Sequence, residues 1–158
     1  MTAPIGIFQK ILVPIDGSEK AKKALDQALQ LAKIHDSDVE ILHVMILAED
    51  LSSEPETPVK IDTPSEWIEE SLTKIRVNAK KMLSEAVEEA SNIGLDGRVT
   101  SKLLVGNPVD LILREAEEGS FDLIVIGDRG LSGLKEFVLG SVSHQVVDHS
   151  KIPVLVVK

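Results

Sequence analysis

The stretch KILVPIDGS, residues 10–18, joins a short apolar run to a turn and then to the start of a helix. Residues 10–15 have the continuous apolar character of a buried strand. After Ser18, a residue type that often caps helices, apolar residues recur at helical spacing as far as Ala32. The stretch therefore indicates a fold in which strands pass through tight turns into helices.

The same alternation continues to the end of the chain. Further strands are expected at 39–45, 99–105, 122–126 and 154–157, and further helices at about 65–92, 108–118 and 141–149. Several strands are apolar without alternation, which is typical of a parallel sheet covered by helices on both faces. We expect one domain over residues 1–158, a three-layer, Rossmann-like α/β fold with an open five-stranded parallel sheet of order 3-2-1-4-5. An acidic loop, about 48–64, should follow the second strand.

The composition limits the classes of function. The chain has 17 Lys and Arg against 26 Asp and Glu and a net charge of −9, which argues against binding nucleic acid by counterion release. There is no cysteine, which excludes disulfides, thiolate chemistry and Cys-ligated zinc. We see no signal peptide and no apolar stretch of about 20 residues that could span a bilayer. We therefore expect a cytoplasmic protein with no membrane partner.

Two strand ends indicate a ligand site. In an open parallel sheet, ligands bind beyond the carboxyl ends of the strands, where the strand order reverses. In the order 3-2-1-4-5 this point lies between strands 1 and 4, so Asp16 and Gly127 should face one crevice. Asp16 could alternatively just cap the first helix.

The segment after the fourth strand carries the spacing Gly127-x2-Gly130-x9-Gly140-Ser141. Glycines allow the backbone to approach a ligand closely, and we expect Gly130 to have a positive φ. The first turn of the following helix offers free N–H groups, and Ser141 and Ser143 add hydroxyls, so the segment predicts a phosphate site without a Walker lysine. The plainer alternative is that these glycines only form turns.

These motifs resemble the universal stress protein family. The matching pieces are KILVPIDGS, ILHV, Val105-Gly106-Asn107-Pro108, FDLIVIGDRG, the glycine motif and the ending IPVLVVK. Within that family, the glycine motif distinguishes members that bind ATP. The resemblance therefore implies a protein that binds ATP, with Mg²⁺ or Mn²⁺, and acts as a nucleotide-dependent regulatory module in the stress response.

The resemblance also implies residue roles. Asp16 would contact the adenosine, Pro14 and Ile15 would shape the pocket, Val44 would meet adenine through its backbone, and Gly106 would lie at the rim. The residues that would surround the ribose and phosphates come from the fourth strand and the segment after it: Ile126, Gly127, Arg129, Gly130, Gly140, Ser141, Val142 and Ser143.

One position departs from the family pattern. Asp128 stands where Ser or Thr is usual, and a carboxylate near phosphates is repulsive unless it points away or helps to hold a divalent cation. His43 lies inside an apolar strand, so we interpret it as a packed core histidine. No pair of histidines has the spacing of a metal site.

A second class of function is an enzyme, such as a slow ATPase or a nucleotidyl transferase. Such an enzyme needs a lysine that clamps the phosphates and a carboxylate that holds a metal near the γ-phosphate. The chain has no G-x4-G-K-[ST] motif. We therefore predict no catalytic residue and, at most, very slow hydrolysis.

The last strand, 154–157, would lie at an edge of the sheet with both of its faces apolar. Only Pro153 and Lys158 bracket it, so little prevents the edge from pairing with another strand. The simplest partner is the same strand of a second copy about a two-fold axis. The family resemblance implies the same homodimer.

Overall fold

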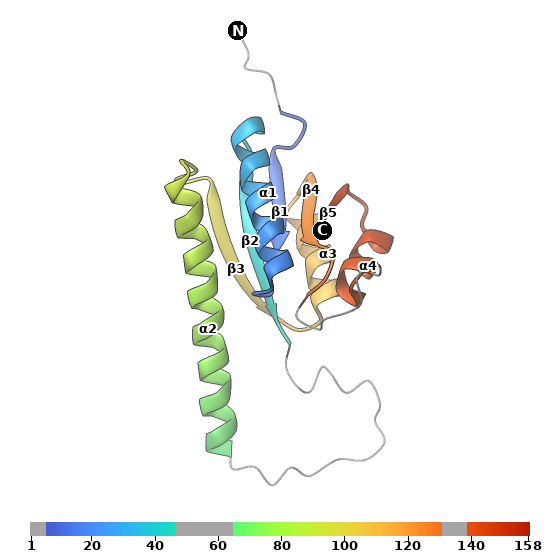
Figure 1. Ribbon diagram of the computed structural model, residues 1–158. Coiled ribbons are helices and arrows are strands. Elements are labelled where there is room, and N and C mark those ends of the chain that lie inside the picture. The colour runs from blue at the N-terminus through green and yellow to red at the C-terminus, as the bar shows by residue number, and fades with distance from the viewer. Residues whose placement is uncertain (1–5, 47–64, 131–138) are drawn as a thin grey trace.

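The computed structural model describes residues 6–46, 65–130 and 139–158 (Figure 1). In chain order the elements are β1 (Lys10–Pro14), α1 (Glu19–His35), β2 (Asp38–Met45), α2 (Ser65–Asn92), β3 (Val99–Val105), α3 (Pro108–Glu118), β4 (Leu123–Gly127), α4 (Ser141–His149) and β5 (Val154–Val157). The expected acidic loop at 48–64 lies outside the described residues. None of the described helices is long and apolar enough to cross a membrane.

The five strands form one parallel sheet of order β3-β2-β1-β4-β5. This confirms the predicted fold class and strand order. The chain winds outward from β1 to β3 on one side, then returns to form β4 and β5 on the other. The order therefore reverses between β1 and β4.

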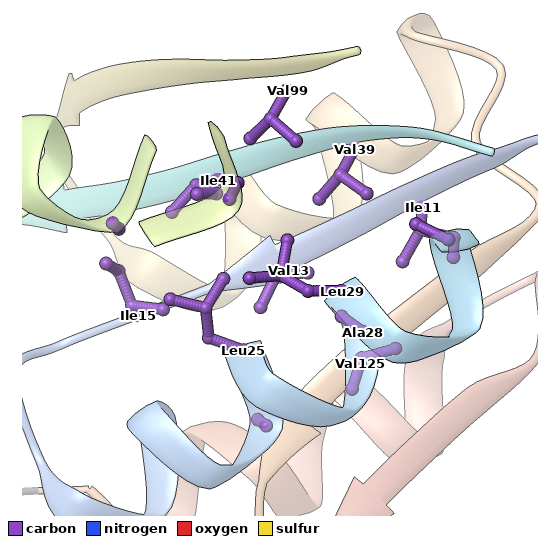
Figure 2. Close-up of a cluster of buried hydrophobic side chains, with 14 of the residues drawn as sticks. Ile11, Val13, Ile15, Leu25, Ala28, Leu29, Val39, Ile41, Val99 and Val125 are labelled. Atoms are coloured by element: carbon purple, nitrogen blue, oxygen red, sulfur yellow. The ribbon is translucent and has the colours of Figure 1, made fainter. Parts of the chain in front are cut away.

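Helices cover both faces of the sheet. On one face α1 and α2 pack over a cluster that includes Ile11, Val13, Val39 and Val125, drawn in Figure 2. On the other face α3 and α4 cover a second cluster built around Leu12, Leu42, Ile124 and Val146. Alternate residues of each strand enter opposite clusters, as the pleat requires.

Local signals in the sequence set the helix boundaries. The Ser18 side chain caps α1 by accepting a hydrogen bond from the amide of Ala21 at 3.1 Å. Asn107 caps α3 in the same way through the amide of Asp110, and Pro108 occupies the first turn. Figure 1 shows that the amino end of α2 extends beyond the carboxyl ends of the strands. That helix therefore passes the edge of the sheet where a ligand would bind.

Candidate functional site

A cavity of about 480 Å³ lies at the carboxyl ends of β1, β2 and β4. It occupies the point where the strand order reverses, which is where open parallel sheets bind their ligands. All the residues that the sequence proposed for the site line this cavity except one, Gly106. The amide of Gly106 instead donates to the carbonyl of Met45 at 2.9 Å, and its φ of 145° turns the chain from β3 toward α3.

Asp16 follows β1 and lines the cavity. One of its carboxylate oxygens, Oδ1, accepts a hydrogen bond from the amide of Ser18 at 2.9 Å. Since Ser18 is the residue that caps α1, Asp16 is not the helix cap. The turn holds the Asp16 carboxylate at the edge of the sheet, between the ends of β1 and β4.

The glycines of the motif meet different neighbours. A Cβ built on Gly127 would lie 2.8 Å from the carbonyl carbon of Lys20, so this glycine allows α1 to pack closely on β4. A Cβ on Gly130 would collide with Oδ2 of Asp16, inside the cavity. The expectation that Gly130 has a positive φ is wrong, because its φ lies outside that region. Glycine suits this position because a side chain would collide with Asp16, and not because the backbone is left-handed.

The start of α4 is tied to the end of β4 by two hydrogen bonds. The amide of Gly140 donates to the carbonyl of Asp128 at 2.7 Å, and the buried hydroxyl of Ser143 donates to the carbonyl of Gly127 at 2.6 Å. The Ser143 hydroxyl group therefore donates its proton to the backbone and not to a ligand. Ser141 is exposed and lines the cavity, at the end of α4 where N–H groups lack intrahelical acceptors.

Asp128 is not among the residues that line the cavity. It is 7 % exposed, and its carboxylate oxygens lie 3.8 Å from Nζ of Lys20 and 3.7 Å from Nε of Arg129. The carboxylate that departs from the family pattern thus faces two cations, Lys20 in the first turn of α1 and Arg129, its neighbour in the chain. Because it is turned from the cavity, this carboxylate would not oppose an anion bound there.

Several lining residues were not proposed from the sequence. They come from β2 and the segments that flank it in space, and most are apolar: Ala21, Leu42, His43, Met45, Ile46, Ile75, Pro108 and Ile112. Ile75 belongs to α2, which reaches the cavity because its amino end extends past the sheet. No motif marks Ile75, since nothing local in the sequence indicates where that end of α2 lies.

The interpretation of His43 as a packed core residue is wrong. His43 is half-buried, lines the cavity and places Nδ1 2.7 Å from the carbonyl oxygen of Ile15. It lies near the carboxyl end of β2, at the edge of the sheet where the cavity is found. Its position two residues from the end of the strand was the signal that could have identified it.

The cavity has two chemically different ends. Its polar side chains at β1, β4 and α4 are Asp16, Arg129, Ser141 and Ser143. Toward β2, α2 and α3 the lining is apolar apart from His43. This arrangement suits a ligand with an anionic group at one end and a flat, mostly apolar group at the other.

A separate group of ionisable side chains lies between the sheet and α3, away from the cavity. Burial, and then the neighbouring Glu115 carboxyl group, raises the pKa of Glu40 to about 6. Burial opposes ionisation of Glu115 as well, but hydrogen bonds from Lys102 and Glu40 outweigh it and lower the pKa of Glu115. Nζ of Lys102 lies 2.8 Å from the Glu115 carboxylate. These contacts therefore favour the ionised form of Glu115 and the protonated form of Glu40.

Comparison with known proteins identifies the family. A profile of the Universal stress protein family matches residues 7–158. Universal stress protein YxiE of Bacillus subtilis is 40 % identical over 152 residues, which cover 96 % of this chain and all of YxiE. The solved structure of MJ0577, a universal stress protein of Methanocaldococcus jannaschii, is 32 % identical, covers 96 % of both chains and has a TM-score of 0.77.

A second solved structure is that of a universal stress protein in complex with cAMP. It is 27 % identical to this chain, covers 96 % of this chain and 97 % of its own, and has a TM-score of 0.66. The matches extend over the sheet, the helices and both ends of the cavity. The chain belongs to the universal stress protein family.

Proposed function

We propose that this protein binds an adenine nucleotide, ATP together with Mg²⁺ or Mn²⁺, and acts as a nucleotide-dependent regulatory module in the stress response. The observation that carries the proposal is the cavity with one polar and one apolar end at the reversal of strand order. A nucleotide has the same division, with charged phosphates at one end and a flat base at the other.

The phosphates would lie at the start of α4. A helix N-terminus carries a partial positive charge and presents N–H groups, which is why it binds phosphate without a lysine. Arg129 adds a cation beside it, and Ser141 adds a hydroxyl. Asp16, between the two ends, is in place to accept hydrogen bonds from ribose hydroxyls.

The metal would be held largely by the phosphates themselves. Among the residues that the structure describes, no group of three or more His, Asp or Glu side chains is placed to hold an ion. Mg²⁺ usually keeps several waters and binds through one or two carboxylates together with substrate phosphates. The Asp16 carboxylate lines the cavity and suits that smaller role.

The relatives support the choice of an adenine nucleotide, since one solved family member is a complex with cAMP. We expect regulation rather than rapid catalysis. The described residues that line the cavity include one permanently charged cation, Arg129, and no lysine. Turnover of ATP should therefore fall well below the enzyme range of about 1 to 1000 s⁻¹.

Calorimetry and thermal unfolding test the nucleotide proposal. A ligand present at about 100 times its Kd stabilises the native state by about 2.7 kcal/mol. For a domain of this size that corresponds to a rise in Tm of roughly 5–10 °C. The proposal is refuted if millimolar ATP gives no heat in calorimetry and no shift in Tm. Mass spectrometry of nucleotide released from the purified protein provides an independent check.

We also propose a homodimer that pairs β5 with the same strand of a second copy. β5 is the edge strand, and Leu155 is 39 % exposed. The amides of Ile124 and Asp128 donate to the carbonyls of Pro153 and Val157, so alternate residues from 153 to 157 face β4. The N–H groups of Val154 and Val156 therefore face away from β4 and are available to a partner.

Two proline variants test the dimer. Val156→Pro removes an N–H that faces outward and should give a folded monomer, with a Tm lowered by the lost partner and by the lost packing of the Val156 side chain on the second core cluster. Leu155→Pro removes an N–H that faces β4, and should lower the stability of the chain itself. Light scattering of the wild type should give twice the mass of the chain, and a monomer at high micromolar concentration would refute the dimer.

A further inference from the structure

His43 has one ring nitrogen fixed by the backbone. Its Nδ1 lies 2.7 Å from the carbonyl oxygen of Ile15. A carbonyl oxygen can only accept a hydrogen bond, so Nδ1 must carry the proton. In the neutral ring the other nitrogen, Nε2, is then an acceptor with no proton to donate.

In the described part of the chain, no residue forms a hydrogen bond with Nε2. The ring is half-buried and borders the cavity. Among the described residues, Nε2 is not a buried atom that lacks a partner, so solvent reaches it until a ligand covers it. A ligand that covers Nε2 without supplying a donor would leave a buried acceptor unpaired, which is costly, so a ligand that supplies a donor here is favoured. The tautomer that Ile15 imposes thus specifies what the ligand must present.

The surroundings of His43 point to a flat, apolar ligand group. The described residues at this end of the cavity are otherwise apolar: Val44, Met45, Ile46, Ile75, Pro108 and Ile112. Ile46 and Ile75 are 47 % and 51 % exposed, although both line the cavity. A purine base that enters between them would cover this apolar surface and bring its edge to His43.

We propose that His43 selects the base of the nucleotide, its Nε2 accepting a hydrogen bond from the 6-amino group of adenine. This inference rests on the proposed nucleotide function. Guanine and hypoxanthine carry an oxygen at position 6, which would face the Nε2 lone pair with a second acceptor. His43 therefore favours 6-amino purines and rejects 6-oxo purines.

The size of the effect follows from the cost of a mismatched polar pair. Leaving a buried acceptor without its donor weakens binding by about tenfold, and sites built to bind an N–H can discriminate more strongly. ATP and ITP are the suitable probes because they differ at position 6 of the base. We expect the wild type to bind ATP about ten times more tightly than ITP, or better.

A third probe removes the substituent altogether. Purine riboside triphosphate has neither an amine nor an oxygen at position 6. It should bind with an affinity between those of ATP and ITP, because it neither satisfies Nε2 nor opposes it. If only the apolar wall mattered, this less polar base would bind at least as well as ATP.

The variant His43→Asn separates the two nitrogens of the ring. The Asn amide nitrogen can still donate to the Ile15 carbonyl, whereas no atom replaces Nε2. The affinity ratio of ATP to ITP should fall to within about twofold. Ile75→Ala is the matched control: it shortens the apolar wall, so both affinities should fall while their ratio stays at the wild-type value.

The outcomes distinguish this inference from the proposed function. If the wild type binds neither ATP nor ITP in calorimetry, the nucleotide function itself is wrong. If it binds both with similar affinity, or if His43→Asn retains the wild-type ratio, the role of His43 is overturned while the nucleotide function stands. The comparison of the three nucleotides uses the wild type alone. It can therefore refute the role of His43 even if His43→Asn folds poorly.

Discussion

Gly127 and Gly130 belong to one sequence motif, yet replacing them with alanine should affect different properties of the protein. A Cβ at residue 127 would lie 2.8 Å from the carbonyl carbon and 2.9 Å from the carbonyl oxygen of Lys20. These are backbone atoms of a helix, so they cannot rotate away. Gly127→Ala must therefore displace α1 from β4.

The magnitude can be estimated from packing. Adding one methyl group to a well-packed site usually costs about 1–3 kcal/mol. For a chain of this length each kcal/mol lowers Tm by roughly 2–4 °C, so Gly127→Ala should lower Tm by about 2–12 °C. Urea denaturation should show a lower midpoint with an unchanged slope.

Gly130→Ala meets a side chain instead of a backbone. The added Cβ would collide with Oδ2 of Asp16, and its next contact is the Asp16 carboxyl carbon at 3.6 Å. The carboxylate can rotate aside, but this disturbs the hydrogen bond that it accepts from the amide of Ser18, so the loss of stability should be about 1 kcal/mol. The rotated carboxylate, however, no longer faces a nucleotide in the cavity.

Loss of a charged hydrogen bond weakens binding by about 1.5–3 kcal/mol, or roughly 10- to 150-fold. Gly130→Ala should therefore lose most of its affinity for ATP in calorimetry while its Tm without nucleotide stays near that of the wild type. The two variants serve as controls for each other. The reasoning is refuted if Gly127→Ala unfolds at the wild-type temperature, or if Gly130→Ala binds ATP as tightly as the wild type.

Three further substitutions test other contacts. Ser143→Ala removes the buried donor to the Gly127 carbonyl and should cost about 1–3 kcal/mol in urea denaturation, whereas Ser141→Ala, at an exposed position, should leave stability unchanged. Asp16→Asn keeps an acceptor for the turn but removes the charge, and should weaken ATP binding several-fold in calorimetry if the carboxylate binds ribose or metal. In the wild type the Glu40 proton stabilises the native state below pH 4.5, and this contribution is lost as the pH rises through about 6, so Glu40→Gln should reduce the fall in stability over that window. The rise in pKa from 4.5 to about 6 corresponds to at most about 2 kcal/mol, which partial exposure reduces further, and identical pH profiles of stability for wild type and variant would contradict the assignment.

Local patterns in the sequence were sufficient to predict the elements of the fold. Ser18 and Asn107 mark helix starts that the structure confirms, and the apolar runs of β1 and β4 form buried strands. Such signals can be recognised from the sequence because helix caps and apolar periodicity depend only on residues close together in the chain. The structure also has the strand order 3-2-1-4-5 that was expected for this alternation of strands and helices.

The apolar end of the cavity could not be predicted in the same way. Ile75 lines the cavity because α2 extends past the strands, and the length of that extension is not encoded in any local pattern. His43 looked like a core residue because apolar neighbours surround it in the sequence. What decides its environment is the cavity at the carboxyl ends of the strands, which is a property of the tertiary structure.

The glycine motif shows most clearly where sequence reasoning ends. Its residues line the cavity, but a left-handed backbone is the wrong reason for Gly130, and close approach of a ligand is an incomplete reason for Gly127. The atoms that exclude a side chain belong to Asp16 and Lys20, more than a hundred positions earlier in the chain. A motif can therefore record contacts with a distant segment as well as contacts with a ligand. In this protein β1, β4 and α1 must come together to form the cavity, so the same glycines that would admit a nucleotide also set the distance between the elements that would bind it.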